Sequence, residues 1–315
     1  LIVGNTIVIK PPELCPLSSN FYGKIFEEVG VPNGIINIVH GFGEITGRKL
    51  VKNKGSDYIV FTGSPEVASE ILKETADRIV PCHFELGGKS AAIIFPDADI
   101  DKAVESTVKG IFKPNAGQIC VAMSRVIVHP KIKDEYMTKL ISKSKKLKIG
   151  PGENPETEVT PLISKDQMQR VSNYVNSGIQ SGATLELGGE EDINKDGNFY
   201  QPTIFDNVST KATIAQEEIF GPVASVFDFE TENEAIEIAN STSYGLASGV
   251  FTADDQKAKW TAERIKAGII WHNDWFVDGI NLPGGGYKKS GYGRDGGMDG
   301  IYSHGQTKRV SKRLY

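Results

Sequence analysis

The chain of 315 residues lacks most features that mark secreted, membrane or nucleic-acid-binding proteins. It has only three cysteines, Cys15, Cys82 and Cys120, so a disulfide framework is not expected. We expect the protein to lie in a reducing compartment, the cytoplasm. No apolar run is long enough to span a bilayer, and a net charge of −5 gives no broad basic surface for nucleic acid. The five histidines show no metal-ligand spacing, so we expect no bound metal. Taken together, these features predict no metal, membrane or nucleic-acid partner.

The start of the sequence also lacks a methionine and a charged leader. The chain opens at once with the strand-like run 1–9. Because a protein rarely begins inside a buried strand, we expect that an N-terminal portion precedes Leu1.

The first ninety residues alternate between the periodicities of strands and helices. Strands are predicted at 6–9, 35–39, 57–61 and 79–85, and helices at 17–29, 45–52 and from Pro65 onward. Such alternation favours a parallel sheet covered by helices on both faces, as in doubly wound nucleotide-binding domains. The predicted fold class is therefore α/β.

A second α/β segment follows this first one. Strands are predicted at 91–95 and 125–128, and helices at 101–112, 134–145, 165–180, 232–240 and 256–265. The glycine-rich region 283–297 is predicted to be loop or turn. The tail from Thr307 to Tyr315 alternates polar and apolar residues and is predicted to be an edge strand.

Glu85 is the first candidate for chemistry, because it ends a predicted strand just before Gly87 and Gly88. Ligands bind beyond the carboxyl ends of the strands in doubly wound sheets. A surface glutamate at a tight turn explains the same pattern equally well.

Cys120 is the second candidate, and Gly117 before it lets the backbone approach a ligand closely. On its own, a cysteine is more often a small buried apolar residue than a nucleophile. A reactive thiolate needs a helix N-terminus or a nearby cation. No His or Lys directly follows Cys120, so backbone amides would have to stabilise a thiolate there.

Two stretches are candidates for binding phosphate. The run 41–47 has the spacing G-x-G-x-x-x-G, one residue longer than the dinucleotide fingerprint, and a plain turn explains it. Ser64 is the better candidate, because it follows a strand and caps a helix with Pro65 at its first position. Glu66 in the first turn would, however, repel a close phosphate.

Six motifs, taken in order along the chain, resemble signatures of the aldehyde dehydrogenase superfamily. They are Val8-Ile9-Lys10-Pro11-Pro12-Glu13, Phe61-Thr62-Gly63-Ser64, Glu85-Leu86-Gly87-Gly88-Lys89, Gly117-Gln118-Ile119-Cys120, Glu217-Glu218-Ile219-Phe220-Gly221-Pro222 and Ser290-Gly291-Tyr292-Gly293-Arg294. One such motif would be weak evidence, but six in the family's order are strong.

The resemblance implies a role for each matched residue. Cys120 would be the nucleophile and Glu85 the general base. The cofactor NAD would be bound by Lys10, Glu13, Ser64, Leu86, Glu218, Phe220 and Gln167, and the substrate pocket would include Asn273 and Gly284. Within that set, Lys10 and Glu13 would hold the adenosine ribose, Ser64 the pyrophosphate, and Glu218 the nicotinamide ribose.

The implied reaction is oxidation of an aldehyde, the expected small-molecule substrate, to an acid through a thiohemiacetal and a thioester. Because an acylating relative would not need a base for hydrolysis, Glu85 favours the hydrolytic branch. The Glu13 carboxylate suits the two ribose hydroxyls and would repel a 2′-phosphate, so NAD is expected rather than NADP.

The resemblance also implies an organisation into four parts. We expect the C-terminal part of an NAD-binding domain at 1–86, a catalytic domain at 87–288, a return segment at 289–302 and an oligomerisation strand at 303–315. Because an exposed edge strand needs a partner, we expect a homodimer or homotetramer.

Three departures from the family pattern bear on activity. The family's N-terminal segment, which carries an asparagine of the oxyanion hole, is missing from the chain. The loop before Cys120 has one extra residue, assigned to Pro114, so a bulge is expected there. Gly284 stands where the family usually has an aromatic residue, which predicts a wider substrate pocket.

Two other functions are compatible with these departures. The first is an inactive or truncated scaffold that binds a nucleotide or a partner. The second is a cysteine acyltransferase without nicotinamide chemistry. Lys10, Glu13 and Glu218, which the resemblance assigns to the riboses of NAD, count against this second function. The sequence does not name the aldehyde, since Trp271, Trp275 and Phe276 suit either a pocket lining or an ordinary core.

Overall fold

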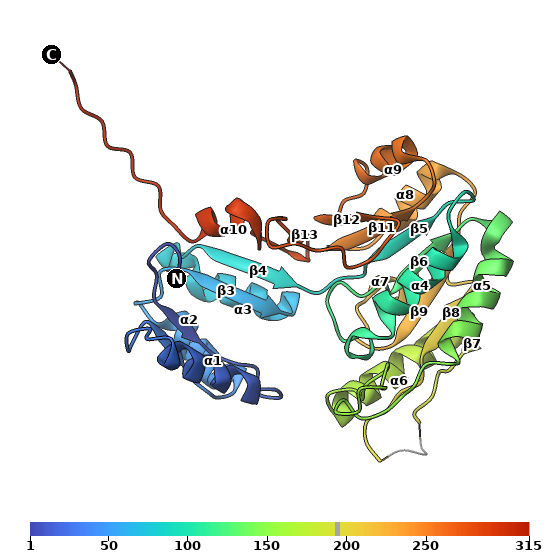
Figure 1. The fold of residues 1–315 in the computed structure, drawn as a ribbon, viewed down its shortest axis with the longest axis horizontal. Helices are drawn as coiled ribbons and strands as arrows, with labels where there is room; N and C mark the ends of the chain where they lie inside the picture. The colour runs from blue at the N-terminus through green and yellow to red at the C-terminus, as the bar shows by residue number, and fades with distance from the viewer. Residues whose placement is uncertain (193–195, 315) are drawn as a thin grey trace. The chain divides into compact units, whose positions relative to one another are not determined.

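The computed structural model describes residues 1–192 and 196–314, and the chain divides into two compact units (Figure 1). Unit 1 consists of Leu1–Glu85, Gly279–Gly284 and Gly293–Tyr315, and unit 2 of Leu86–Asp278 and Gly285–Tyr292. Tyr315, the last residue of the predicted tail, lies outside the described residues. Each unit is described by itself below.

Unit 1 alternates short strands and helices, as predicted. Its elements are β1 (Ile7–Ile9), α1 (Leu17–Glu28), β2 (Ile36–Ile38), a π-helical turn (Gly43–Gly47), α2 (Arg48–Lys52), β3 (Ile59–Gly63), α3 (Pro65–Thr75), a 3-10 turn (Ala76–Arg78), β4 (Cys82–Leu86) and α10 (Gly297–Ser303). Strands β1 and β2 pair in parallel, with Ile7 opposite Ile36, while β3 and β4 are neighbours in a separate sheet.

The start of α3 is confirmed by its cap. The Ser64 hydroxyl accepts a hydrogen bond from the Val67 amide at 3.4 Å, and Pro65 occupies the first helical position. Beyond α3, the strand predicted at 79–85 begins later, at Cys82. The reason is Ile79, whose left-handed φ of 55° ends the 3-10 turn before the strand.

Helix α1 forms where it was predicted, but none of its residues is buried. Its apolar side chains stay in contact with solvent, for example Phe21 at 62% and Tyr22 at 55% exposed. The periodicity of the sequence therefore predicted the position of the helix, but nothing in the described chain covers the apolar face of that helix.

Unit 2 is built on a seven-stranded sheet in the order β12-β11-β5-β6-β9-β8-β7 (Figure 1). These strands are β5 (Ala91–Ile94), β6 (Arg125–Val128), β7 (Thr184–Leu187), β8 (Thr203–Asp206), β9 (Val223–Asp228), β11 (Ala247–Phe251) and β12 (Ile269–His272). All neighbours pair in parallel except β7, which runs antiparallel to β8. Strands β5 and β6 are buried along their whole length, as short apolar runs in a parallel sheet should be. The predicted α/β class is confirmed.

The helices of unit 2 pack along this sheet. They are α4 (Ile100–Ile111), α5 (Pro130–Ser144), α6 (Lys165–Gln180), α7 (Thr213–Gln216), α8 (Glu232–Asn240) and α9 (Asp255–Ala262). Helix α4 packs on α5, while α8 contacts β5 and β6 and α9 contacts β11. Polar N-caps explain where several of these helices begin. The cap side chain accepts a hydrogen bond from a backbone amide of the first turn at Asp99, Ser164, Thr231 and Asp254. Helix α5 begins at Pro130 rather than at residue 134, because proline suits the first helical position.

Three short strands complete unit 2. Strand β10 (Tyr244–Gly245) pairs antiparallel with β13 (Tyr287–Lys288), and β14 (Gly291–Tyr292) follows within the glycine-rich region that was predicted to be loop. Within the described parts of the chain, no helix combines the length and apolar character that crossing a membrane requires.

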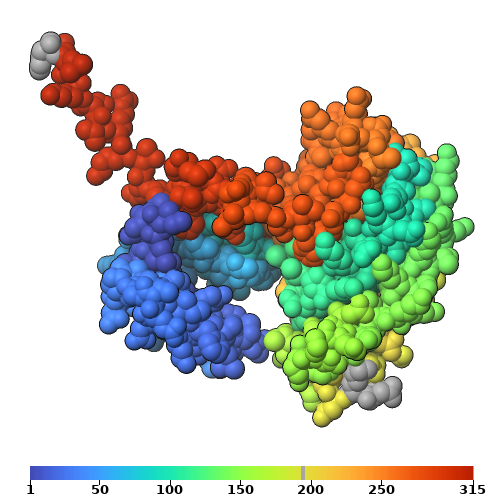
Figure 2. Space-filling model, viewed as in Figure 1, coloured from blue at the N-terminus to red at the C-terminus, as the bar shows by residue number. Residues whose placement is uncertain are grey.

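The C-terminal tail after α10 forms neither helix nor strand up to Leu314. Its apolar residues Val310 and Leu314 are exposed, and Figure 2 shows the segment as a single extended strip. A pairing strand needs a neighbouring chain, so the predicted role of the tail in assembly stays a prediction.

Candidate active site

The loop before Cys120 in unit 2 has an unusual backbone. A short 3-10 turn, Pro114–Gly117, links α4 to the Cys120 segment. Asn115, Ala116 and Gly117 have φ values of 47°, 53° and 75°, so three consecutive residues lie in the left-handed region. Such conformations are costly for residues other than glycine and concentrate at functional sites. These three residues directly follow Pro114, the position at which a bulge was predicted.

Gln118 braces the loop from both sides of its amide group. Its Nε2 donates to the Asn115 carbonyl at 2.7 Å, and its Oε1 accepts from the Ile163 amide at 2.9 Å. Gly117 is required by space as well as by φ, because a Cβ there would overlap the Gly221 carbonyl. The half-buried Cys120 therefore follows a segment that is fixed on several sides.

The Gly87–Gly88 turn brings two predicted site residues together within unit 2. The Gly88 amide donates to Glu218 Oε1 at 3.1 Å. A Cβ at Gly87 would overlap the Glu218 carboxylate, and one at Gly88 would overlap the Cys120 carbonyl oxygen. Gly88 is thus needed for the close approach of the two backbones, while Gly87 lies against the end of the Glu218 side chain.

Gln167 holds the segment that carries Glu218 and Phe220. Its Nε2 donates to the Ile219 carbonyl at 3.1 Å and to the Phe220 carbonyl at 2.7 Å. Arg170 adds a hydrogen bond to the Glu218 carbonyl at 2.9 Å. Phe220 has a φ of 58° and presents part of its ring to solvent. Gln167 therefore fixes the backbone of this segment; its contact with a cofactor stays a prediction.

Lys89 is a buried lysine that sequence reasoning did not single out. Its Nζ has no hydrogen-bond partner among the described residues. Burial, followed by the nearby Arg125 charge, lowers the pKa of Lys89 to about 7, while Glu218 opposes that shift. The sequence places it at the end of a quoted motif, directly after the two glycines, but no role was predicted for it.

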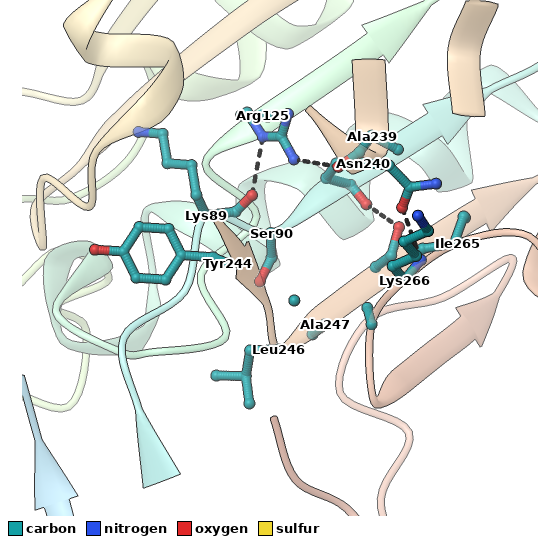
Figure 3. A pocket seen from close by; sticks show the side chains of 14 residues that line it. Lys89, Ser90, Arg125, Ala239, Asn240, Tyr244, Leu246, Ala247, Ile265 and Lys266 are labelled. Carbon is teal, nitrogen blue, oxygen red and sulfur yellow. Dashed lines mark hydrogen bonds between the residues drawn. The ribbon is translucent and has the colours of Figure 1, made fainter. Parts of the chain in front are cut away.

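Arg125 anchors the backbone on which Lys89 stands. Its guanidinium donates to the carbonyls of Lys89, Ile238 and Ala239 at 2.9, 2.7 and 2.7 Å, beside a cavity of about 10 Å³ (Figure 3). That volume holds about one water molecule, so the cavity is too small for a substrate.

Trp271 and Trp275 belong to the core of unit 2, which settles one of the alternatives left open above. Their rings lie 4.7 Å apart, and Trp275 is fully buried. Trp275 Nε1 donates to the Val121 carbonyl at 3.1 Å, so this ring supports the residue that follows Cys120.

Glu85 lies in unit 1, near the end of β4, and is half-buried. Its Oε1 is 3.2 Å from His83 Nε2. Burial raises the pKa of Glu85, and the His83 hydrogen bond opposes that rise.

Lys10 and Glu13 form a second group in unit 1. Lys10 Nζ donates to Glu13 Oε2 at 2.9 Å and to the Gly41 carbonyl at 3.0 Å, while Glu13 Oε1 accepts from the Gly43 amide at 3.3 Å. The hydrogen bond from Lys10 is the main reason that the pKa of Glu13 is lowered. Lys10 and Glu13, the residues predicted to hold the adenosine ribose, therefore form hydrogen bonds with the glycine turn at 41–47. The sequence had indicated this turn only weakly as a phosphate-binding site.

Asn273 and Gly284 take part in backbone contacts. Asn273 Oδ1 accepts from the Thr252 amide at 3.0 Å and its Nδ2 donates to the Thr252 carbonyl at 2.9 Å. Gly284 in unit 1 exchanges two 2.8 Å backbone hydrogen bonds with Asp295. Their contact with a substrate stays a prediction.

The predicted site residues therefore fall into two groups. Unit 2 contains Cys120, Leu86, Glu218, Phe220, Gln167 and Asn273, and unit 1 contains Lys10, Glu13, Ser64, Glu85 and Gly284. His83 belongs to no motif, so sequence reasoning missed it. Lys89 and Gln118 lie inside quoted motifs, but sequence reasoning gave neither of them a role, because their surroundings are set by tertiary packing.

Comparisons with known proteins agree with the resemblance drawn from the six motifs. A sequence model of the aldehyde dehydrogenase family matches residues 1–310. A betaine aldehyde dehydrogenase of Bacillus subtilis is 42% identical over 98% of this chain and 64% of its own length. The mitochondrial aldehyde dehydrogenase family 2 member B4 of Arabidopsis thaliana is 44% identical over 100% of this chain and 58% of its own length.

Solved structures give the same result. The NAD+ complex of an aldehyde dehydrogenase from Bacillus cereus has a TM-score of 0.91 and 42% identity, covering 94% of this chain and 60% of that one. An NAD-dependent aldehyde dehydrogenase from Sinorhizobium meliloti has a TM-score of 0.94 and 38% identity, covering 96% and 60%. The chain thus spans about three-fifths of the length of these relatives.

Proposed function

The chain belongs to the aldehyde dehydrogenase family, and from that membership we propose that the protein oxidises an aldehyde to a carboxylic acid with NAD, using Cys120 as nucleophile and Glu85 as base. The observation that carries the proposal is the close approach of Gly88 to the Cys120 carbonyl within unit 2. Gly88 follows Glu85 by three residues, so the turn after the base abuts the backbone of the nucleophile.

The reaction follows from the chemistry of these two side chains. The Cys120 thiolate attacks the aldehyde carbon, and the Cys120 amide donates a hydrogen bond to the oxyanion of the thiohemiacetal. The hydride acceptor for this carbon would be supplied by NAD, held by the residues named below. The thioester that remains is attacked by water as Glu85 removes a proton from it, which releases the acid and restores the thiolate.

The residues of unit 1 fit the adenosine end of NAD. The Glu13 carboxylate, held by Lys10, has the acceptors needed for two ribose hydroxyls and would repel a 2′-phosphate. Ser64 stands at the N-terminus of α3, where amides are oriented toward an anion such as pyrophosphate. We therefore propose NAD in preference to NADP.

The nicotinamide end is assigned to unit 2. Glu218 would bind the ribose and Phe220 would pack near the ring, on a segment that Gln167 fixes, with Leu86 nearby in the chain. The raised pKa of Glu85 supports the hydrolytic branch, because a base with a pKa nearer neutrality takes a proton from water more readily.

The substrate is assigned only as an aldehyde, a small molecule. Gly284 would widen the pocket and Asn273 would border it. We also propose a homodimer or homotetramer in the cytoplasm; light scattering of the full-length protein tests the assembly, and a stable monomer would contradict it.

Three variants of the full-length protein test the catalytic roles. Cys120→Ala should abolish NADH formation from aldehydes while NAD binding, followed by calorimetry, persists. Glu85→Gln should keep a burst of about one NADH per site and lower steady turnover by about 10²–10⁴-fold, since only hydrolysis needs the base. Cys15→Ser, at an exposed cysteine, is the matched control and should behave as wild type.

The outcomes separate the roles from one another. Full turnover in Cys120→Ala would remove Cys120 as nucleophile. A burst that is lost together with steady turnover in Glu85→Gln would show that Glu85 acts before hydrolysis. Absence of NAD binding in the wild-type protein would favour an acyltransferase.

A further inference from the structure

His83 is a fully buried histidine, 0% exposed, two residues before Glu85 in β4. Residues two apart in a strand point to the same face, which explains why the two side chains meet. His83 Nε2 lies 3.2 Å from Glu85 Oε1 and 3.6 Å from Asp295 Oδ1. When these carboxylates are ionised they only accept hydrogen bonds, so the ring nitrogen that faces them is then the one that carries a proton.

The imidazole is clamped in this orientation by its surroundings in unit 1. Gly293, with a φ of 104°, lies directly against the ring, and a Cβ there would overlap the imidazole. The ring of His304 has its centroid 6.5 Å from that of His83, and Tyr58 packs on His304 at 5.0 Å. The ring therefore has little room to turn away from Glu85.

The other ring nitrogen, Nδ1, is buried without a hydrogen-bond partner among the described residues. A buried polar atom without a partner costs free energy, which an apolar side chain of similar size would avoid. Filling space is thus a poor explanation for a histidine at this position, and the Nε2 contact is the better one.

We propose that His83 is a positioning residue that holds the Glu85 carboxylate through an Nε2–H···Oε1 hydrogen bond and keeps it ionised as the base. The inference rests on the proposed function, in which Glu85 activates water. The charged and titratable groups that face Glu85 are His83, Asp295 and Arg294. Of these, His83 and Arg294 favour the charged carboxylate, while burial and Asp295 disfavour it.

Two variants separate the hydrogen bond from the volume of the ring. His83→Leu removes the donor, and His83→Gln keeps a side-chain N–H close to the place of Nε2. In the full-length protein, His83→Leu should leave the NADH burst intact and slow steady turnover by about ten-fold near neutral pH. Its acid limb should move to higher pH, because loss of the donor raises the pKa of Glu85, and His83→Gln should restore the position of the limb.

A measurement independent of turnover keeps the proposal testable if His83→Leu does not fold. In protein with ¹⁵N-labelled histidine, the His83 ring should show Nε2 protonated, and Glu85→Gln should shift that resonance. Unchanged His83 resonances in Glu85→Gln would overturn the proposal.

The failure of this inference differs from failure of the proposed function. If Glu85→Gln stops steady turnover but the pH profile of His83→Leu matches that of wild type, His83 does not position the base, while the base itself stands. If Glu85→Gln turns over normally, the proposed role of Glu85 fails first.

Discussion

The two units contain similar elements but bury them very differently. In unit 2 the central strands β5, β6 and β9 and helices on the sheet form one continuous apolar core. In unit 1 the helix α1 buries none of its residues, and α3 buries only three. Amphipathic periodicity therefore predicts where a helix forms in both units, but it does not tell whether the described chain covers its apolar face.

The largest expected difference between the units is in the cost of removing an apolar side chain. Ile127 is fully buried in the central strand β6, while Ile25 in α1 is half exposed. Ile127→Ala should lower the free energy of unfolding by about 2–5 kcal/mol, and Ile25→Ala by less than about 1 kcal/mol. All three tryptophans, Trp260, Trp271 and Trp275, lie in unit 2, so tryptophan fluorescence during urea unfolding reports on that unit.

Equal losses in the two variants would break the comparison. They would mean that Ile25 is covered in the native protein by something other than the described chain. The loss in Ile25→Ala is measured by circular dichroism during urea unfolding, because this signal includes the helices of unit 1, where there is no tryptophan.

The same contrast explains what the sequence could predict. Capped helices with clear periodicity, such as α6 from Ser164 and α8 from Thr231, are predicted to the residue, because cap and stripe are both local signals. Strands β8, β9, β11 and β12 were not predicted, because a short apolar run acquires its meaning only from the neighbours with which it pairs.

The candidate site divides in the same way. The motifs name Cys120, Glu85 and Glu218, because each belongs to a contiguous pattern. The hydrogen bonds that hold these segments join residues distant in sequence: Gln118 reaches Ile163, and Gln167 reaches Phe220. Such contacts are set by tertiary packing, which one sequence does not encode in any local signal.

The second prediction concerns the strained loop of unit 2. Gly117→Ala would place a Cβ against the Gly221 carbonyl at a φ of 75°. We expect a loss of about 1–3 kcal/mol in stability and a changed rate of alkylation at Cys120, since the loop must shift. Gly182→Ala is the matched control, because its φ of 86° gives similar backbone strain while nothing lies near its Cβ. Identical alkylation rates in the two variants would show that the close contact at Gly117 does not hold the Cys120 loop.

The third prediction uses the buried Lys89. Its pKa in the folded protein is about 7, below its ordinary value of 10.5. The unfolded chain therefore binds the proton more tightly, so this lysine costs stability below about pH 7, and the cost fades as the pH rises toward 10.5. Lys89→Met should stabilise the protein by at least about 1 kcal/mol near pH 7 and by less near pH 10. A gain in stability that does not change with pH would show that the pKa of Lys89 is the same in the folded and unfolded chain. Lys102→Met, at an exposed lysine, is the control.

The smallest predicted difference is between ion pairs. In unit 2, Lys133 Nζ lies 2.7 Å from Asp206 and 2.6 Å from Asp228, with its side chain 12% exposed. In unit 1, Arg48 pairs with Glu74 at 2.9 Å on the surface.

A double-mutant cycle should give a coupling free energy of about 1 kcal/mol for Lys133 and Asp206. It should give no measurable coupling for Arg48 and Glu74, because solvent screens the exposed pair. Added salt should reduce the first coupling only slightly, since partly buried charges are screened less. Equal couplings that vanish together in salt would mean that the ion pairs of unit 2 are as exposed as those of unit 1.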